Sequence, residues 1–384
     1  MSSPRVLMIC GDFPPFVSGV GDYADKLAGA MQDLGADVTL ITSKSAHGPV
    51  SGAAARGFRM LRTIDHWGMS NRRQIIDECC RGYDLIQLQY PCVSYGKSPL
   101  INLLPSMLRL RRDSAPTVIT IHDFRVMRHR WRARVAPMLW AVDGLIHVDE
   151  GDWPFIRSWG VGNGKPRAHI PIAANAQPVP TNAILRSQWR TDLGFAPNDL
   201  VVAFFGILYL HKGLPELLGA VQDLRAAGRS VRLLVLGDFD RQADYRIGME
   251  RMLGDPSVKW VRGAELDEIS RCLHAADFAA LPFHSGASTN RGSMLSTLAH
   301  GLPTITTNGP CTPPDFAKNY DVLLVPVNDR AALTSAIARL ADEPALAQRM
   351  RHAALSRHRS WDAVAKETLA FYASLITGNR RVAA

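Results

Sequence analysis

The sequence has few cysteines, and their spacing gives no sign of pairing. Six cysteines in 384 residues form no CxxC pair and follow no regular interval, so no disulfide framework is expected. The twelve histidines are also scattered, and no cluster of His, Cys or carboxylate residues has the spacing of a zinc site. We therefore expect reduced thiols, no bound metal and a reducing compartment.

Long apolar runs are missing as well. The longest, residues 201–210, has ten residues, which is about half of the ~20 that cross a membrane. The run at residues 6–10 has five residues and is too short for a signal peptide. These absences predict a cytosolic protein. The composition, 47% hydrophobic and 21% charged, predicts a full core, and the length suits two domains.

Acidic residues are in the minority. There are 35 of them against 44 Lys and Arg, a net charge of +9, and the excess gathers between residues 103 and 134, where apolar residues alternate with arginines. Such a basic amphipathic segment suits an anionic membrane face or a phosphorylated ligand, and the alternative is an ordinary solvated helix face. No nucleic-acid recognition module is visible. The candidate membrane or acceptor surface consists of Arg109, Arg111, Arg112, Arg128, Arg130 and Trp131.

The sequence does show a repeated alternation of short apolar strands and amphipathic helices. A strand at 6–10, a glycine- and proline-rich loop at 11–21, a helix at 22–34 and a strand at 37–42 form one βαβ unit. A second such series begins with a strand at 200–206, and the segment 171–180, with three prolines, is the clearest linker. The pattern predicts two doubly wound α/β halves facing a central cleft, with ligands at the carboxyl ends of the strands.

The first loop contains a match to the dinucleotide fingerprint that we discount. Residues 19–24, GVGDYA, fit GxGxxA, but Gly19 follows the strand by nine residues and no acidic residue ends the second strand. A nicotinamide-dependent oxidoreductase is therefore disfavoured. Gly19 and Gly21 still allow close backbone approach to a phosphate.

Three further places at strand ends carry candidate chemistry. His122 ends a predicted strand at 116–122 and is either a catalytic or a structural histidine. Lys212 follows Gly206 and the strand that ends there, and is either a phosphate-binding cation or an exposed lysine. The loop 284–292 enters a helix at 293–300, whose free N–H groups would seat a phosphate if the loop binds a ligand. The candidate ligand-binding residues of that helix entry are Ser288, Asn290, Arg291, Gly292 and Ser293.

Several blocks together resemble the retaining GT-B glycosyltransferases of the large family 4 group. They are SGVGDYADKLAGAM, TIHDF, FFGILYLHKGLPELLGAV, LAHGLPTITTNGP with YDVLLVPVNDRAALTSAIARLADEP, and SWDAVAKETLAFYASL, in the family's order. The resemblance implies two Rossmann-like domains. Residues 1–178 would bind the acceptor, residues 179–357 the nucleotide-sugar donor, and residues 358–384 would form a terminal helix that crosses back to the first domain.

The resemblance also implies roles. Lys212 would neutralise the donor diphosphate, Gly19 and Gly21 would approach that phosphate, and His122 would lie near the transferred sugar. Retention is usually described in this family as same-face attack assisted by the leaving phosphate, so neither a protein nucleophile nor a metal ion or other cofactor is implied.

Two departures from the family pattern stand out. Ser288 and Ser296 occupy positions where the family usually has two glutamates, and a hydroxyl cannot replace a carboxylate acceptor. Ile207 replaces an arginine five residues before the lysine, and we hypothesise that Arg291 supplies the missing cation.

The sequence as a whole predicts a glycosyltransferase. It would move a sugar from a nucleotide-sugar to a hydroxyl acceptor with retention, as a cytoplasmic protein. Cell-envelope polysaccharide or glycolipid assembly at the inner face of a membrane is an open option, as is a small soluble acceptor. The main alternative is a degenerate member that binds nucleotide, sugar or a partner without transfer, and the two serine replacements motivate it.

Overall fold

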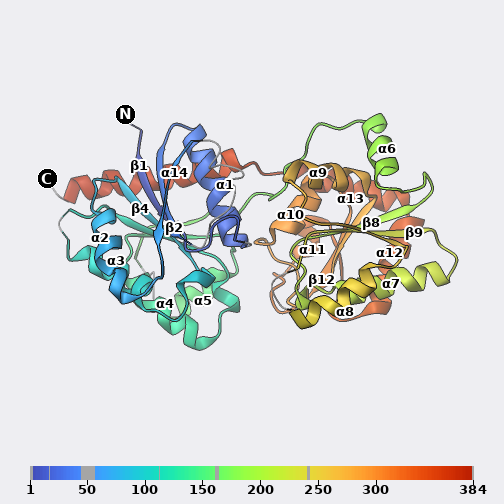
Figure 1. Ribbon diagram of the computed structural model, residues 1–384, viewed down its shortest axis with the longest axis horizontal. Coiled ribbons are helices and arrows are strands. Elements are labelled where there is room, and N and C mark those ends of the chain that lie inside the picture. The colour runs from blue at the N-terminus through green and yellow to red at the C-terminus, as the bar shows by residue number, and fades with distance from the viewer. Residues whose placement is uncertain are drawn as a thin grey trace. The chain divides into compact units, whose positions relative to one another are not determined.

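A computed structural model describes residues 3–16, 18–44, 57–111, 113–160, 164–239 and 243–382. The chain divides into two compact units (Figure 1). The first unit consists of Met1–Ile172 together with Ser360–Ala384, and the second unit is Ala173–Arg359. Each unit is a parallel sheet with helices, so the predicted pair of Rossmann-like α/β domains, the GT-B architecture, is confirmed.

The sheet of the first unit has the strand order β3-β2-β1-β4-β5-β6-β7, in which every neighbouring pair is parallel. The order reverses at β1, and ligands of doubly wound folds bind at such a switch point. The strands are β1 (Arg5–Ile9), β2 (Asp37–Ser43), β3 (Arg59–Ile64), β4 (Leu85–Tyr90), β5 (Thr117–Ile121), β6 (Gly144–His147) and β7 (Arg167–His169). The helices are α1 (Gly19–Asp33), α2 (Arg72–Cys79), α3 (Leu100–Arg109), α4 (His129–Ala141), α5 (Asp152–Ser158) and α14 (Trp361–Val382).

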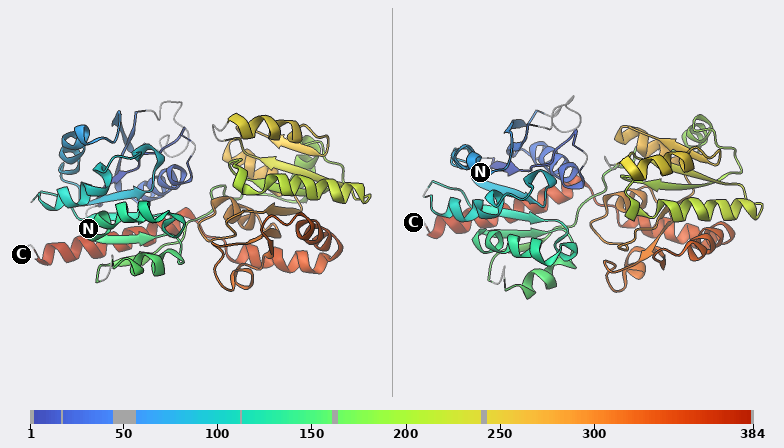
Figure 2. Two further views of the ribbon diagram at one scale, coloured as in Figure 1. Left: turned by 90° about the horizontal axis from the view of Figure 1, so that it is seen from below. Right: turned by 60° about the horizontal axis from the view of Figure 1, so that its bottom comes forward.

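The helix α14 belongs to the first unit although it ends the chain. It lies beside α1 (Figures 1 and 2), and its Phe371 and Leu375 pack against Gly144 at the start of β6. Burial of these apolar side chains supplies the stabilisation that holds the last helix to the first hundred and seventy residues.

The second unit has the strand order β10-β9-β8-β11-β12-β13, again parallel throughout. Its strands are β8 (Leu200–Phe205), β9 (Val231–Leu236), β10 (Val258–Val261), β11 (Phe278–Leu281), β12 (Thr304–Asn308) and β13 (Leu323–Pro326). Its helices are α6 (Ala183–Asp192), α7 (Leu214–Ala226), α8 (Ala243–Leu253), α9 (Leu266–Ala275), α10 (Gly292–Ala299), α11 (Phe316–Tyr320), α12 (Arg330–Asp342) and α13 (Pro344–Ser356).

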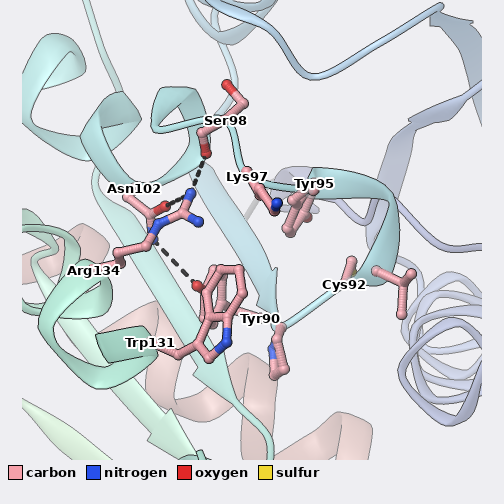
Figure 3. A pocket seen from close by; sticks show the side chains of 11 residues that line it. Tyr90, Cys92, Tyr95, Lys97, Ser98, Asn102, Trp131 and Arg134 are labelled. Atoms are coloured by element: carbon pink, nitrogen blue, oxygen red, sulfur yellow. Dashed lines mark hydrogen bonds between the residues drawn. The ribbon is translucent and has the colours of Figure 1, made fainter. Parts of the chain in front are cut away.

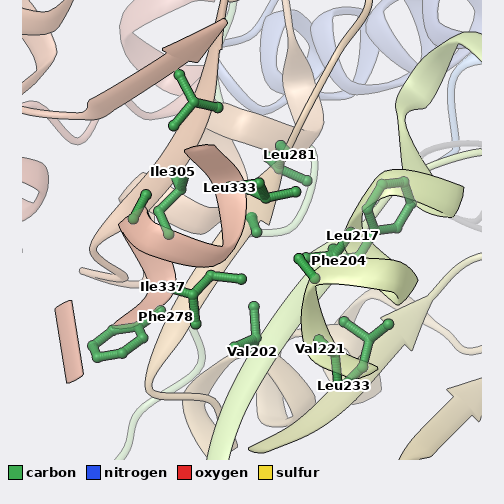
Figure 4. Close-up of a cluster of buried hydrophobic side chains, with 14 of the residues drawn as sticks. Val202, Phe204, Leu217, Val221, Leu233, Phe278, Leu281, Ile305, Leu333 and Ile337 are labelled. Atoms are coloured by element: carbon green, nitrogen blue, oxygen red, sulfur yellow. The ribbon is translucent and has the colours of Figure 1, made fainter. Parts of the chain in front are cut away.

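Alternation along the strands divides the core of the second unit into two layers. On β8, Val202 and Phe204 face a cluster that includes Leu217 of α7 and Ile337 of α12 (Figure 4). Their neighbours on the same strand belong to a smaller cluster with α9 on the opposite face. The central strands β8 and β11 are buried on both faces, which explains their continuous apolar sequences.

Candidate active site

The loop after β1 leads into α1 through a serine cap. The Ser18 hydroxyl accepts a hydrogen bond from the Gly21 N–H, 3.3 Å away, and the helix begins at Gly19 rather than at the predicted residue 22. The cap satisfies an N–H group of the first turn, and this outweighs the low helix propensity of the two glycines. Gly19 and Gly21 therefore lie in the first turn of α1.

The two glycines differ in what surrounds them. A Cβ on Gly21 would lie 2.9 Å from the Asp12 carbonyl oxygen, so packing within the chain already requires glycine there. A Cβ on Gly19 would meet nothing within 4 Å. No contact among the described residues therefore explains Gly19, which leaves its open surface available to a ligand.

Asp12, which the sequence analysis did not select, joins this loop to the segment after β4. Its buried carboxylate accepts hydrogen bonds from the Val93 and Ser94 N–H groups at 2.7 and 2.8 Å and from the Ser94 hydroxyl at 2.5 Å. Hydrogen bonds from several donors satisfy a carboxylate that would otherwise be costly to bury. Only the fold brings residues 12 and 93 together, so no local sequence signal identified them.

His122 lies directly after β5, at the predicted edge of the sheet, and is buried. Its Nε2 is 3.0 Å from Gln89 Oε1, and its ring contacts the edge of Tyr23, with centroids 4.7 Å apart. Since an amide oxygen only accepts, Nε2 carries the proton and Nδ1 keeps a lone pair. Burial lowers the pKa of His122 to about 3, so the imidazole is neutral at physiological pH.

Gln89 is a second residue that the sequence analysis missed. It is fully buried on β4, and its Nε2 has no hydrogen-bond partner within the described part of the chain. A buried amide donor without a partner is costly, and such groups often mark functional sites. The His122–Gln89 pair is therefore a second feature of this sheet edge, beside the glycine turn of α1.

Lys212 and Arg291 in the second unit come together against one aromatic ring. The Lys212 Nζ lies 4.7 Å from the centroid of Phe283, and the Arg291 Cζ lies 5.0 Å from the same centroid. The two residues are far apart in the sequence, at the ends of different loops. Burial lowers the pKa of nearby His211, and the charges of Lys212 and Arg291 lower it further.

Two contacts fix the loops that carry these cations. Gly213 has a φ of +73°, and a Cβ there would lie 2.1 Å from the Pro282 carbonyl oxygen, so only glycine allows the Lys212 loop to approach residue 282. Next to it, the His284 N–H donates to the His211 carbonyl at 3.0 Å. Arg291 is positioned by the Ser285 hydroxyl, which accepts from its Nη2 at 2.5 Å.

The entry to α10 combines backbone donors with small side chains. Arg291 is the N-cap residue, and its side chain makes no capping hydrogen bond. Gly206 lies behind Ser293, whose Cβ is 3.4 Å from the position of a Gly206 side chain, and Gly292 lies against the Asn175 side chain. The N-terminus of α10 therefore offers its N–H groups beside the two cations, the arrangement that favours anions.

The two serines at the positions of the family's glutamates are turned toward the chain itself. The Ser296 hydroxyl accepts from the Ala176 N–H at 3.0 Å and donates to the Gly292 carbonyl at 2.7 Å. The buried Ser288 hydroxyl bonds to the Asn290 side chain. Both hydroxyls serve the fold in these positions, and their contact with a donor stays a prediction.

The basic segment of the first unit is only partly a surface. Arg128 and Arg130 are exposed, Arg109 pairs with Asp143 at 3.3 Å, and Arg111 pairs with Asp113 at 3.3 Å. Arg112 lies outside the described residues. Trp131 is half-buried and lines a cavity.

Other arginines of residues 103–134 are internal, so this segment does not present all its arginines on one amphipathic surface as the sequence suggested. Arg125 forms a 2.9 Å ion pair with buried Asp149, and Arg132 donates to backbone carbonyls at Phe124 and Arg125. The chain bends between α3 and α4 through the strand β5, so the arginines of residues 109–134 do not share one helix face.

Within the described ranges, no group of three or more His, Cys, Asp or Glu residues is arranged to hold a metal ion. No helix of those ranges is long and apolar enough to cross a membrane.

The family model for glycosyl transferases group 1 matches residues 199–343, which contain the Lys212 loop and α10. This part of the second unit is therefore similar to that family. Glycogen synthase of Mycobacterium tuberculosis is 25% identical over 98% of this chain and 96% of its own length. A GDP-mannose-dependent monoacylated alpha-(1-6)-phosphatidylinositol monomannoside mannosyltransferase of Corynebacterium glutamicum is 22% identical over 89% of this chain and 90% of its own.

The solved structure of Anabaena HepE in complex with UDP and glucose covers 97% of this chain and 100% of its own, with a TM-score of 0.75 at 15% identity. At that identity the likeness concerns the fold, and it agrees with the GT-B architecture of two parallel sheets. The family-model match and the two curated relatives bear out the prediction of a glycosyltransferase.

Proposed function

We propose that this glycosyltransferase moves a hexosyl group, with retention, from a nucleotide-diphosphate sugar to a hydroxyl acceptor. The observation that carries the proposal is the convergence of Lys212 and Arg291 on Phe283 at the N-terminus of α10. Two cations and a row of backbone donors suit a diphosphate, which needs compensation both when bound and as it leaves. HepE, a relative in fold, was solved with UDP and with UDP-glucose.

In this proposal, the acceptor oxygen forms the new bond to the anomeric carbon while the bond from that carbon to the diphosphate oxygen breaks. The acceptor proton passes to the leaving diphosphate, and a nucleoside diphosphate is the second product. Lys212 and Arg291 stabilise the charge that develops on the leaving group, so no step requires a metal ion or a protein nucleophile.

The first unit would bind the acceptor and contact the transferred sugar. The open first turn of α1 at Gly19 would approach the diphosphate, and neutral His122 with Gln89 would hydrogen-bond the sugar.

Peripheral binding at the inner face of an anionic membrane, with a lipid-linked acceptor in envelope assembly, is a further part of the proposal. It is supported by exposed Arg128 and Arg130 and by Trp140 and Leu110, which are 58% and 86% exposed. The Corynebacterium relative's name describes a phosphatidylinositol mannoside acceptor.

The alternative is a member of the family that binds a nucleotide without transfer. It is favoured by one observation: Ser296 stands where the family has a glutamate, and its hydroxyl is engaged with the backbone of residues 176 and 292.

Thermal melts with UDP, GDP, ADP and their sugars test the proposal, because at a fixed concentration a ligand that binds more tightly raises the midpoint further. We expect one nucleotide and its sugar to raise it, and proton NMR of the product to show the donor's anomeric configuration. A nucleotide shift without turnover would favour the alternative, and no shift with any nucleotide would contradict both.

A further inference from the structure

The first unit contains a partly open cavity of about 360 Å³ at the carboxyl end of β4. This volume is at the lower end of the ~300–1,000 Å³ typical of small-molecule sites. Figure 3 shows its walls, which come from the segment after β4 and from the starts of α3 and α4. The lining residues are Tyr90, Pro91, Cys92, Val93, Tyr95, Gly96, Lys97, Ser98, Asn102, Trp131 and Arg134.

Aromatic rings form much of the wall. Tyr90 and Tyr95 are stacked with centroids 6.2 Å apart, and the Trp131 ring lies nearby with the Arg134 guanidinium 4.8 Å from its centroid (Figure 3). Flat aromatic faces suit the apolar face of a sugar or cyclitol ring, whose hydroxyls then point to polar groups at the rim.

The charge of the cavity has one sign. Lys97 and Arg134 are among its lining residues, and no Asp or Glu is. Arg134 Nη2 donates to the Ser98 carbonyl at 2.7 Å and to Asn102 Oδ1 at 3.4 Å, and Asn102 in turn donates to the Tyr90 hydroxyl at 3.3 Å. Neutral partners therefore orient the guanidinium, and in the described part of the chain no carboxylate lies within ion-pair distance of it.

The cavity adjoins the residues proposed to surround the transferred sugar. The Tyr90 carbonyl accepts from the His122 N–H at 2.8 Å, and Gln89, the residue before Tyr90, pairs with the His122 ring. The cavity and the His122–Gln89 pair therefore share the carboxyl end of β4, with the Tyr90 and Gln89 side chains on opposite faces of the strand.

We infer that this cavity binds the acceptor, and that the acceptor is a sugar or cyclitol ring bearing a phosphate or carboxylate. The ring stacks on Tyr90, Tyr95 and Trp131, and the anion binds Arg134 with help from Lys97. The identification of the ligand as the acceptor rests on the proposed function. The preference of the cavity for an anion rests on its lining residues alone.

The first experiment measures calorimetric binding, without nucleotide, of glucose 6-phosphate, glucose and inorganic phosphate. We expect glucose 6-phosphate to bind at least tenfold more tightly than either of the others. Arg134→Met should remove that preference, while Arg157→Met, at an exposed arginine of α5 outside the cavity, should keep it. Equal affinity for glucose and glucose 6-phosphate, or loss in neither variant, would overturn the inference.

A second arm distinguishes a free anionic sugar from a lipid headgroup. Vesicles containing phosphatidylinositol are compared with vesicles of equal charge containing phosphatidylserine. A preference for phosphatidylinositol that Arg134→Met removes and Arg157→Met keeps would support the cavity and assign the ring to a headgroup. Absence of any Arg134-dependent binding in both arms, in protein that still binds its nucleotide, would refute this inference and leave the proposed function intact.

Discussion

The Lys212–Arg291 pair of the second unit and the His122–Gln89 pair of the first unit differ in charge. In the second unit, cationic Lys212 and Arg291 lie against Phe283 beside a helix N-terminus. In the first, a neutral histidine and an amide are buried together, since burial holds the pKa of His122 at about 3. A diphosphate needs charge, whereas sugar hydroxyls need neutral donors and acceptors. The difference shows how two similar sheets can serve two halves of one reaction.

Removal of the Lys212 side chain should cause the largest loss of activity. Lys212→Ala is expected to lower kcat/KM by ~10²–10³, because charge stabilisation of a leaving group contributes on that scale. Steady-state kinetics with the donor identified by thermal melts would measure it. Lys259→Ala, on the edge strand β10, is the matched control, and an equal loss in both variants would contradict a specific role.

Arg291→Ala should weaken nucleoside diphosphate binding by about 10- to 100-fold, the range for hydrogen bonds to charged groups. Isothermal titration calorimetry measures the change, with exposed Arg271→Ala of α9 as control. Unchanged affinity would show that Arg291 does not replace the arginine missing at Ile207.

The two glycines in the first turn of α1 should respond differently to substitution, Gly21 through stability and Gly19 through ligand affinity. Gly21→Ala should lower the free energy of unfolding by about 1–3 kcal/mol, since its Cβ would press on the Asp12 carbonyl. Gly19→Ala should leave stability unchanged or raise it, yet reduce donor affinity. Denaturant unfolding and nucleotide titration of both variants test this, and a Gly19→Ala protein with full affinity would remove the ligand role of Gly19.

Acid should destabilise the first unit through His122. Its pKa is about 3 in the folded protein against ~6.5 unfolded, so the unfolded chain binds more protons between these values and the free energy of unfolding falls as pH falls from 6.5 to 3. His122→Asn should flatten this part of the pH profile, while exposed His129→Asn should not. Equal slopes in both variants would argue against a buried neutral imidazole.

The smallest effect is expected at the exposed arginines of the first unit. Arg128→Glu and Arg130→Glu should each weaken flotation with anionic vesicles by ~1 kcal/mol or more, and the loss should shrink in high salt. Binding that ignores lipid charge would contradict the membrane proposal.

Periodicity identified the strands that end at His122 and Gly206 because buried parallel strands are continuous apolar runs. It did not identify the helix start at Gly19, where a serine cap outweighs propensity. The count of arginines in residues 103–134 also did not show that Arg125 and Arg132 are internal, because their bonds to Asp149 and to the Phe124 carbonyl form only in the fold.

The sequence analysis did not predict the cavity, because residues from separate segments form it. Its walls combine residues 90–98 with Asn102, Trp131 and Arg134, and none of these segments has a motif by itself. Gln89 and Asp12 were not predicted either, because their partners are distant in the sequence and come close only through the order of the strands in the sheet. Sequence patterns therefore predicted candidate residues that lie on a single loop. Sites formed by several loops could be recognised only in the three-dimensional structure.

The placement of α14 has a consequence for the order in which the protein assembles. The ring of Trp361 contacts Tyr23 at 5.5 Å between centroids, and Tyr23 contacts His122, so the end of the chain supports the histidine through one aromatic side chain. During synthesis the second unit, a continuous segment, has all its residues once Arg359 has emerged. The first unit begins earlier but is complete later, because α14 (Trp361–Val382) is part of it. A ribosome-bound chain therefore completes the unit that carries Lys212 and Arg291 before the unit that carries His122.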